Sequence, residues 1–381
     1  RRLEYILDGT EDATGREFDG RCLLSAEGPC NVDAALGDTS WKAAMDEEMR
    51  CINENQTWRL STLPAGHKAI GLKWVFKVKR DPAGNIVKHK ARLVAKGYAQ
   101  REGVDFDEVF APVARMETVR VLLALAAHSG WEVHHMDVKS AFLNGELGEE
   151  VYVAQPPGYL AVGKEDRVLK LHKALYGLHQ APRAWYAKLD RSLTELGFTR
   201  SPLEHAVYRR GDATSFLLVG VYVDDLIITG TDVSAIVKFK QQMQQLFKMI
   251  YLGLLSYYLG IEVSQSEGQI TLHQGSYAAK ILEAAGMSEC NACATPMENR
   301  LKLKKKDGGE PADATLYRSV IGSLRYLVNT RPDIAFAVGI TSRFMEKPSS
   351  HHWVAVKQIL RYIKGTMTMG VVIRLAMEKQ H

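Results

Sequence analysis

Two adjacent carboxylates stand out because apolar segments enclose them on both sides. Asp224 and Asp225 close the tetrapeptide YVDD at 222–225, after the apolar run 217–221 and before the apolar run 226–228. Like charges in a partly desolvated turn raise each other's pKa, and a divalent cation relieves that repulsion. The pattern therefore predicts a metal-binding turn between two strands. The alternative interpretation of this aspartate pair is a solvated Asp-Asp hairpin turn.

A third carboxylate, Asp137, ends the strand predicted for 132–138. Carboxylates at the ends of neighbouring strands can hold two Mg²⁺ ions, which activate an attacking hydroxyl and neutralise charge on a transferring phosphoryl group. The three aspartates together predict phosphoryl-transfer chemistry. Two alternatives stay open here: Asp137 also fits a surface residue at a strand end, and a metal-dependent nuclease would use the same carboxylates.

The positive charge is concentrated in one short segment. The chain has 49 Lys and Arg against 44 Asp and Glu, a net charge of +5, but residues 73–96 hold eight basic residues and one Asp and so carry +7. Apolar and basic residues alternate in 73–79 and again in 88–96, on either side of a turn at 81–85. This predicts a β-hairpin with one apolar and one basic face. The basic face fits a polyphosphate partner, and the alternative is a merely solvated face.

The elements that position these residues follow from apolar periodicity and from the residues that end helices. The sequence predicts further strands at 133–138, 216–223, 226–229, 251–263 and 269–273. It predicts helices from about 39 onward, then at 114–129, 182–196, 232–246, 276–285, 315–328, 333–345 and 351–363, with a charged linker at 302–311. Helices around a small antiparallel sheet define an α+β class.

Composition narrows the class of protein. With 46% apolar and 24% charged residues, the chain fits a globular protein of two or three subdomains. It has neither an apolar run of about 18 residues nor the order of a signal peptide, so we expect neither a membrane nor a secreted protein. The five cysteines fit a reducing compartment, and Cys290 and Cys293 lack a second ligand pair for zinc. The pairs 134–135 and 351–352, both His-His, lack the spacing of a metal site.

Nine short motifs follow one another along the chain. In order they are 55–58 (NQTW), 71–77 (GLKWVFK), 90–97 (KARLVAKG), 110–115 (FAPVAR), 136–145 (MDVKSAFLNG), 174–178 (ALYGL), 222–225 (YVDD), 258–262 (YLGIE) and 330–334 (TRPDI). With this ordered set the chain resembles the reverse transcriptase of copia-type long-terminal-repeat retrotransposons, from about Trp41 to Met369. The ordered set is far more specific than any single motif.

The resemblance implies an α+β fold of the right-hand polymerase type, with fingers, palm and thumb and an antiparallel palm sheet flanked by helices. It implies three parts: a disordered polyprotein linker (1–39), the fingers and palm with the start of the thumb (40–300), and a thumb and connection region (301–381) that stops before ribonuclease H. We expect one slice of a polyprotein.

The resemblance also implies the roles of the carboxylates. Asp137, Asp224 and Asp225 would be catalytic and would hold two Mg²⁺ ions, for which Mn²⁺ is a substitute. Asp137 and Asp224 would ligate directly and Asp225 would support them, with the backbone carbonyl of Val138 as a further ligand.

The incoming nucleotide is expected against Lys77, Lys90, Arg92, Phe142, Gln180 and Tyr222. Lys90 and Arg92, and more weakly Lys77, would contact the triphosphate, since a guanidinium clamps phosphate oxygens. The ring of Phe142 would clash with a 2′-hydroxyl and favour deoxynucleotides, and Gln180 would lie near the sugar. The turn Leu259–Gly260 would grip the primer end.

The expected activity is RNA-directed and DNA-directed DNA synthesis. The expected partners are an RNA or DNA template with its primer, dNTPs and other parts of the polyprotein, with no membrane, in a cytoplasmic particle or the nucleus. Tyr251 and His179 depart from the family pattern, and no acidic set of a ribonuclease H follows 361–365. The rival interpretation is a decayed retroelement remnant that at most binds nucleic acid.

Overall fold

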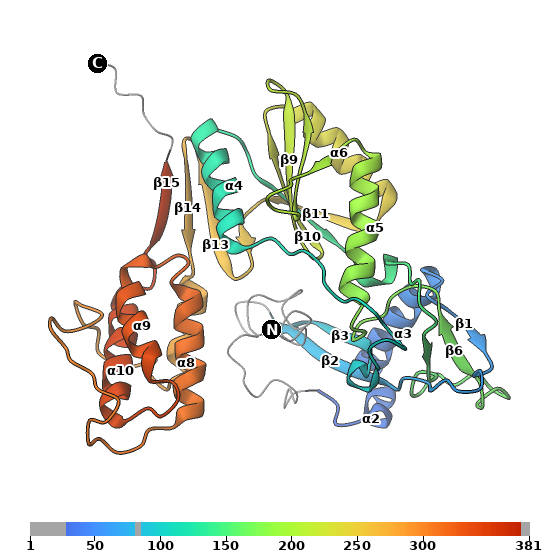
Figure 1. Ribbon diagram of the computed structural model, residues 1–381, viewed down its shortest axis with the longest axis horizontal. Coiled ribbons are helices and arrows are strands. Elements are labelled where there is room, and N and C mark those ends of the chain that lie inside the picture. Colours follow the sequence, from blue (N-terminus) through green and yellow to red (C-terminus); the bar gives the residue numbers. More distant parts are fainter. Residues whose placement is uncertain (1–27, 81–84, 375–381) are drawn as a thin grey trace. The chain divides into compact units, whose positions relative to one another are not determined.

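The computed structural model describes residues 28–80 and 85–374 (Figure 1). The chain divides into two compact units, the first formed by 28–114 and 136–251 and the second by 115–135 and 252–374. The two units do not test the expected limits of fingers, palm and thumb, which stay a prediction. Over the described ranges, no helix has the length and apolar character needed to span a membrane.

Two helices open the described part of the first unit. α2 (Val32–Gly37) begins after Asn31 and α3 (Thr39–Glu54) begins after Asp38, and each cap accepts hydrogen bonds from backbone N–H groups of the first turn. The sequence predicts irregular structure for 1–39, which does not hold for 32–37, because Asn31 caps a helical turn that buries Ala35. Residues 1–27 of that segment lie outside the described residues.

The two strands of the predicted basic hairpin are confirmed, whereas 81–84 of its turn lie outside the described residues. β2 (Leu72–Arg80) pairs antiparallel with β3 (Ile86–Ala95), and Lys77 stands opposite Lys90. Side chains at paired positions share a face of the hairpin. α3 packs on the other, apolar face, where the ring of Trp41 contacts the ring of Phe76 edge-on. Lys77 and Lys90 therefore lie on the face opposite the one that packs on α3, while Lys88 forms an ion pair with Glu47 of α3.

The base of this hairpin meets the segment 174–178 at backbone contact. Ala95 N donates to Tyr176 O at 2.7 Å, and Gly177 has a φ of +90°. A Cβ atom on Gly97 would overlap the carbonyl of Gly177, and a Cβ atom on Gly177 would overlap the carbonyl of Ala95. Only glycine fits at both positions. Two residues without side chains thus fix the hairpin to the core of its unit.

The first unit contains a six-stranded sheet with the strand order β11, β4, β10, β9, β8, β7, of which Figure 1 labels β9, β10 and β11. The strands are β4 (His134–Val138), β7 (Thr199–Arg200), β8 (Val207–Gly211), β9 (Phe216–Tyr222), β10 (Asp225–Gly230) and β11 (Met249–Leu254). Helices α5 (Ala181–Glu195) and α6 (Val233–Leu246) pack against it. The strands and helices predicted here are confirmed, with small shifts at their ends.

A three-stranded sheet in the same unit was not predicted. It consists of β1 (Trp58–Ser61), β6 (Val168–Leu171) and β5 (Tyr152–Val153), in that order. Trp58 pairs with Leu171, far away in the chain. Strands this short carry too few alternating residues for a local pattern to reveal them.

The second unit combines a four-stranded sheet with helices (Figure 1). The sheet has the order β12 (Tyr257–Tyr258), β13 (Ile261–Ser266), β14 (Gln269–His273), β15 (Gly370–Arg374). α4 (Met116–Ser129) packs against β14 and β15. The other helices are α7 (Gly275–Ala284), α8 (Ala314–Leu327), α9 (Ala335–Thr341) and α10 (Ser350–Gly365), which enclose an apolar core of their own. The sequence predicts all but β15, although α9 is shorter than the 333–345 expected.

One of the two histidine pairs caps a helix in the second unit. Ser349 and His352 form the capping box of α10, and His352 is fully buried. The hydroxyl of Ser349 also donates to Asp307 Oδ2 at 2.6 Å. Asp307 lies in the predicted linker 302–311, all of it described and without a helix or strand. The linker is thus tied to the start of α10.

A buried carboxyl group makes the α3–hairpin contact sensitive to pH. Glu48 Oε1 accepts the N–H of Leu93 at 3.3 Å, and burial raises the pKa of Glu48 from 4.5 to about 7, opposed by that hydrogen bond and by Lys90. A raised folded-state pKa means that this group stabilises the fold below pH 4.5 and that the contribution is lost as pH rises through about 7. The α3–hairpin contact should therefore weaken in alkaline solution.

We expect Glu48→Gln to raise the melting temperature at about pH 8.5, by the equivalent of at most about 3 kcal/mol, and to change little near pH 4.5. Glutamine keeps the acceptor for Leu93 without the buried charge. Glu47→Gln is the matched control, since Glu47 is half exposed and pairs with Lys88, and its effect should stay below about 1 kcal/mol. Calorimetry at both pH values tests this, and equal shifts for the two variants would contradict it.

Candidate active site

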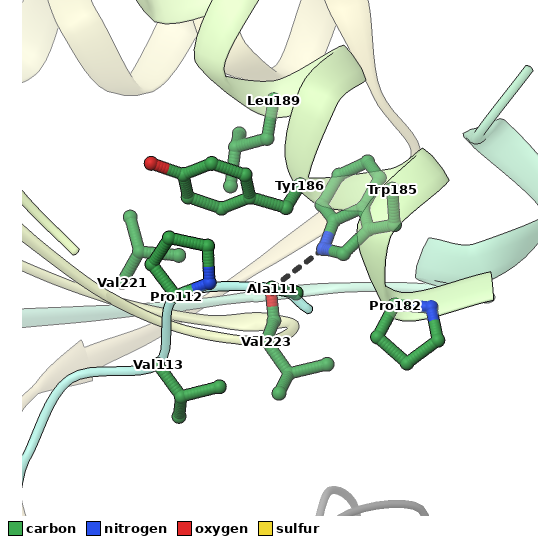
Figure 2. A pocket seen from close by; sticks show the side chains of 9 residues that line it. All are labelled: Ala111, Pro112, Val113, Pro182, Trp185, Tyr186, Leu189, Val221 and Val223. Atoms are coloured by element: carbon green, nitrogen blue, oxygen red, sulfur yellow. Dashed lines mark hydrogen bonds between the residues drawn. The ribbon is translucent and has the colours of Figure 1, made fainter. Parts of the chain in front are cut away.

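The two adjacent aspartates lie at the tip of the β9–β10 hairpin. Tyr222 pairs with Asp225, so Val223 and Asp224 form a two-residue turn. Val223 has a φ of +55°, which a β-branched residue rarely adopts. Its carbonyl accepts the indole N–H of Trp185 at 2.7 Å (Figure 2). The predicted strand–turn–strand arrangement is confirmed, and the turn that carries the aspartates is a strained one.

The strand that carries Asp137 lies beside this hairpin. β4 is the neighbour of β10 in the sheet, and Val138 N donates to Asp224 O at 2.9 Å. On the other side, Lys139 N donates to Lys248 O at 2.8 Å, just before β11. The end of β4 is therefore held from both sides, and Asp137 stands next to the turn.

The negative charges of the other two aspartates act on Asp224. Asp224 is only 2% exposed, and burial raises its pKa well above 3.8, with the negative charges of Asp225 and Asp137 raising it further. Arg92 of β3 acts in the opposite sense. Charges have such an effect on a pKa only when they lie close to the group. The structure thus brings together the three aspartates that the sequence singled out, while their catalytic roles stay a prediction.

The carboxylates do not form a finished coordination sphere. In the part of the chain that the structure describes, no group of three or more His, Cys, Asp or Glu side chains is arranged to hold a metal ion. Asp137 Oδ2 lies 3.2 Å from the ammonium of Lys139. Asp224 Oδ1 is buried and has no hydrogen-bond partner among the described residues. A buried, unsatisfied carboxylate oxygen beside two further carboxylates is a donor set that fits a hard divalent cation.

The basic face of the β2–β3 hairpin contributes Arg92 to this region. Its guanidinium lies 4.1 Å from the ring centroid of Tyr176, a cation–π contact. Because Tyr176 also receives the backbone N–H of Ala95, the same residue orients both the hairpin and its arginine. Lys77 and Lys90 share the face of Arg92 and are partly exposed. Tyr176 was not predicted as a site residue, because nothing in the motif 174–178 shows that its ring contacts Arg92.

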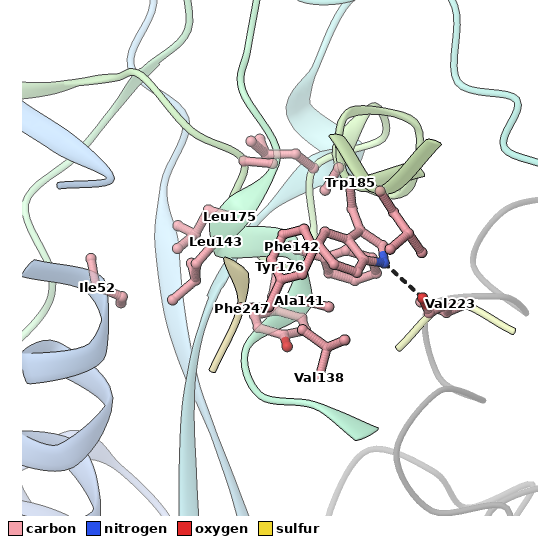
Figure 3. Close-up of a cluster of buried hydrophobic side chains, with 14 of the residues drawn as sticks. Ile52, Val138, Ala141, Phe142, Leu143, Leu175, Tyr176, Trp185, Val223 and Phe247 are labelled. Atoms are coloured by element: carbon pink, nitrogen blue, oxygen red, sulfur yellow. Dashed lines mark hydrogen bonds between the residues drawn. The ribbon is translucent and has the colours of Figure 1, made fainter. Parts of the chain in front are cut away.

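Phe142 lies in a short 3₁₀ helix, Ala141–Asn144, directly after β4. It is 2% exposed and packs against the Tyr176 ring at 4.9 Å between centroids (Figure 3). Phe142 therefore forms part of the core beneath Arg92. Its contact with a sugar stays a prediction.

Gln180 precedes α5, and both the oxygen and the nitrogen of its side-chain amide form hydrogen bonds. Its Oε1 accepts from Gln100 Nε2 at 2.9 Å, and its Nε2 donates to the carbonyl of Asp105 at 2.8 Å. Gln100 also accepts the N–H of His179 at 2.8 Å. Gln180 is 2% exposed, so the loop 97–105 covers it. Sequence reasoning missed Gln100, because no local pattern shows which side chain meets Gln180.

The remaining expected residues lie in both units, and Tyr222 is next to the turn that carries Asp224. Tyr222 ends β9 and is half-buried. In the second unit, Leu259 and Gly260 form the two-residue turn between β12 and β13, both with positive φ. The hydroxyl of Tyr326 donates to the Leu259 carbonyl. Tyr251 is a departure from the family pattern. The ammonium of Lys240 lies 4.0 Å from the centroid of the Tyr251 ring, in a cation–π contact.

Comparison with protein families assigns the chain to a class. The family described as reverse transcriptase (RNA-dependent DNA polymerase) matches residues 55–299. The chain therefore belongs to this family, which confirms the resemblance that the ordered motifs indicated.

Individual relatives agree with that membership. The chain is 42% identical over 334 residues to a retrovirus-related Pol polyprotein from transposon TNT 1-94 of Nicotiana tabacum, covering 85% of this chain and 25% of the relative. It is 39% identical over 355 residues to the corresponding polyprotein from transposon RE1 of Arabidopsis thaliana, covering 92% and 24%. The chain thus spans about a quarter of the length of these relatives.

Among solved structures, the chain is similar to a foamy viral protease-reverse transcriptase in complex with double-stranded DNA. The TM-score is 0.44 and the sequence identity is 12%, and the similarity covers 86% of this chain and 49% of that one. A similarity of this size carries no argument. The α+β class with antiparallel sheets rests instead on the strand pairing described above.

We expect Asp224→Asn to raise the melting temperature at about pH 8 without divalent ions. The folded pKa of Asp224 lies above 3.8, so its ionisation destabilises the fold as pH rises, and asparagine removes that effect. The melting temperature should rise by about 2–4 °C for each kcal/mol of relieved repulsion, and the rise should shrink steadily toward pH 4.

Asp212→Asn is the matched control, at the opposite end of β9. Backbone hydrogen bonds from Ser215 and Thr214 lower the pKa of Asp212 to about 2, so this variant should lower the melting temperature at the same pH. Thermal unfolding in EDTA at a series of pH values measures the expected rise in melting temperature for Asp224→Asn and the expected fall for Asp212→Asn. A loss of stability in Asp224→Asn at about pH 8 would show that the carboxylate is not under repulsion.

Proposed function

We propose that this chain is the polymerase part of a retrotransposon Pol polyprotein and copies an RNA or DNA template into DNA by two-metal nucleotidyl transfer. The observation that carries the proposal is the buried, unsatisfied Oδ1 of Asp224, in a turn that a hydrogen bond from Val138 joins to the end of the strand that carries Asp137. The charges of Asp225 and Asp137, which raise the pKa of Asp224, support the proposal. Family membership supports it. In this proposal the β2–β3 hairpin belongs to the fingers, the six-stranded sheet is the palm, and α8 to α10 belong to the thumb and connection region.

The carboxylates would hold two Mg²⁺ ions, or Mn²⁺ in their place. Asp137 and Asp224 would be direct ligands, with Asp225 in support and the carbonyl of Val138 as a backbone ligand. Such ions lower the pKa of a primer 3′-hydroxyl and neutralise charge on the phosphoryl group. The strained turn and the hydrogen bond from Val138 fix the ligands before any ion arrives, which lowers the reorganisation that binding requires.

Other side chains of this unit would bind and orient the nucleotide. Arg92, already close enough to influence Asp224, would pair with phosphate oxygens, and Lys90 and Lys77 on the same face would add charge. Phe142 would limit the space at the 2′ position from its packed site beneath Tyr176. Gln180 would meet the sugar once its amide exchanges partners with Gln100 and Asp105. Tyr222, at the end of β9, would complete the nucleotide contacts.

Primer extension on a homopolymer RNA template tests the activity. We expect the folded chain with Mg²⁺ and a dNTP to extend the primer, and Asp137→Asn or Asp224→Asn to lower kcat by about 1000-fold, since a metal site contributes several kcal/mol. Asp212→Asn, in the turn between β8 and β9, should retain activity. Extension that survives Asp224→Asn would contradict the mechanism.

Two other outcomes identify the rivals. A folded, unmodified chain that extends no primer points to a decayed remnant. Cleavage of labelled nucleic acid that is indifferent to dNTPs points to a metal-dependent nuclease.

Sugar selection gives a separate prediction. We expect Phe142→Val to raise the ratio of kcat/KM for a ribonucleotide to that for the matching deoxynucleotide by about tenfold or more, because a smaller side chain leaves room for the 2′-hydroxyl. Phe142 is buried, so the variant also loses stability. Measuring both substrates on one preparation cancels that loss from the ratio. An unchanged ratio would remove Phe142 from the nucleotide site.

A further inference from the structure

The strained turn that carries Asp224 is held by a tryptophan on another element. Trp185 lies in α5, is 1% exposed and donates its indole N–H to the carbonyl of Val223 at 2.7 Å (Figures 2 and 3). Both groups are buried, where a hydrogen bond is stronger and its loss leaves two polar groups unsatisfied. This is a short bond to the one peptide group that precedes Asp224.

The geometry of the peptide unit links that bond to the carboxylate. The Val223 carbonyl and the Asp224 nitrogen belong to one planar group, so fixing the direction of the carbonyl fixes the plane from which the Asp224 side chain departs. The next peptide is fixed as well, because Asp224 O accepts from Val138 N at 2.9 Å. Asp224 is therefore held on both sides, by Trp185 before it and by Val138 after it.

The turn needs this support because its own conformation is unfavourable. Val223 adopts a φ of +55°, a strained value for a β-branched residue. An apolar pocket beside it is lined by Val223, Val221, Trp185 and the loop 111–113 (Figure 2). The hydrogen bond from Trp185 offsets part of the backbone strain at Val223.

The tryptophan itself is firmly placed. Its ring meets Phe247 edge-on at 5.2 Å between centroids. Gly145 lies so close to α5 that a Cβ atom there would come 2.6 Å from the backbone nitrogen of Trp185. The donor is thus anchored to the core rather than carried by the turn.

We propose that Trp185 is a positioning residue, whose indole N–H holds the Val223 carbonyl and thereby sets the direction of the Asp224 carboxylate. This inference rests on the proposed polymerase function for its kinetic consequence. Its structural consequence, the order of the turn, holds independently of catalysis.

Trp185→Phe removes the donor and keeps an aromatic ring, and Trp74→Phe is the matched control. Trp74 in β2 is also buried and also donates its indole N–H to a backbone carbonyl, that of Pro157 at 3.0 Å. Both variants lose one indole hydrogen bond in the first unit. Only Trp185→Phe loses it at the turn.

Amide hydrogen exchange of the peptide spanning 222–225, followed by mass spectrometry, gives the readout without activity. We expect exchange there to become about tenfold faster in Trp185→Phe and to stay unchanged in Trp74→Phe. In primer extension, kcat of Trp185→Phe should fall about 10- to 100-fold while KM for the dNTP and for the template-primer stays the same. Equal turn exchange in the two variants, or a change in KM alone, would overturn the proposal.

A double variant keeps the test informative if Trp185→Phe folds poorly. Glycine at 223 adopts the positive φ without strain, so Trp185→Phe should accelerate turn exchange less in a Val223→Gly background than in the natural one. Additive effects would overturn the proposal. An unmodified chain that extends no primer would defeat the polymerase function, and the exchange experiment would still decide the role of Trp185.

Discussion

A single backbone hydrogen bond, from Val138 N to the carbonyl of Asp224, determines where the three carboxylates meet. It joins the end of β4 to the turn between β9 and β10. Without it Trp185 would still hold the turn at Val223, but the peptide after Asp224 would no longer be tied to the end of the strand that carries Asp137. The place of β4 beside β10 in the sheet supports the same arrangement. The fold therefore keeps the negative charges of Asp137 and Asp225 close to Asp224.

That constraint explains several features around the turn. Arg92 opposes the repulsion from the basic hairpin, and the hairpin reaches this position because Tyr176 accepts the Ala95 N–H and contacts the guanidinium. The left-handed conformation of Val223 and the buried, unsatisfied oxygen of Asp224 are local costs of the same arrangement. Costs of this kind are usual at sites prepared for a ligand.

Much of this region is visible in the sequence because its signals are local. The alternation in 73–79 and 88–96 specifies the hairpin and its faces, and the apolar runs on both sides of Asp224 specify a strand, a turn and a strand. The ordered motifs place Asp137 in the same site, through a family resemblance.

Other features depend on which distant residues meet, and no local pattern encodes that. β15 can be recognised only from its pairing with β14. The hydrogen-bond partners of the Gln180 amide can be recognised only once the loop with Gln100 is folded over it. Trp185 fits the apolar face of a helix in the sequence, and its polar bond to the turn appears only in three dimensions. The sequence predicts that Trp185 faces the core, but it does not predict that its indole N–H contacts the carbonyl of Val223.

The close approach of Gly97 and Gly177 bears on how a mobile element loses function as it accumulates mutations. Every missense change in a glycine codon adds a β-carbon, and at either position that atom would collide with a main-chain oxygen. The collision would push the basic hairpin off its support while every aspartate stayed intact. Inspection of the YVDD tetrapeptide in genomic copies would then overcount the working ones, and these two glycines would be the more telling positions to read.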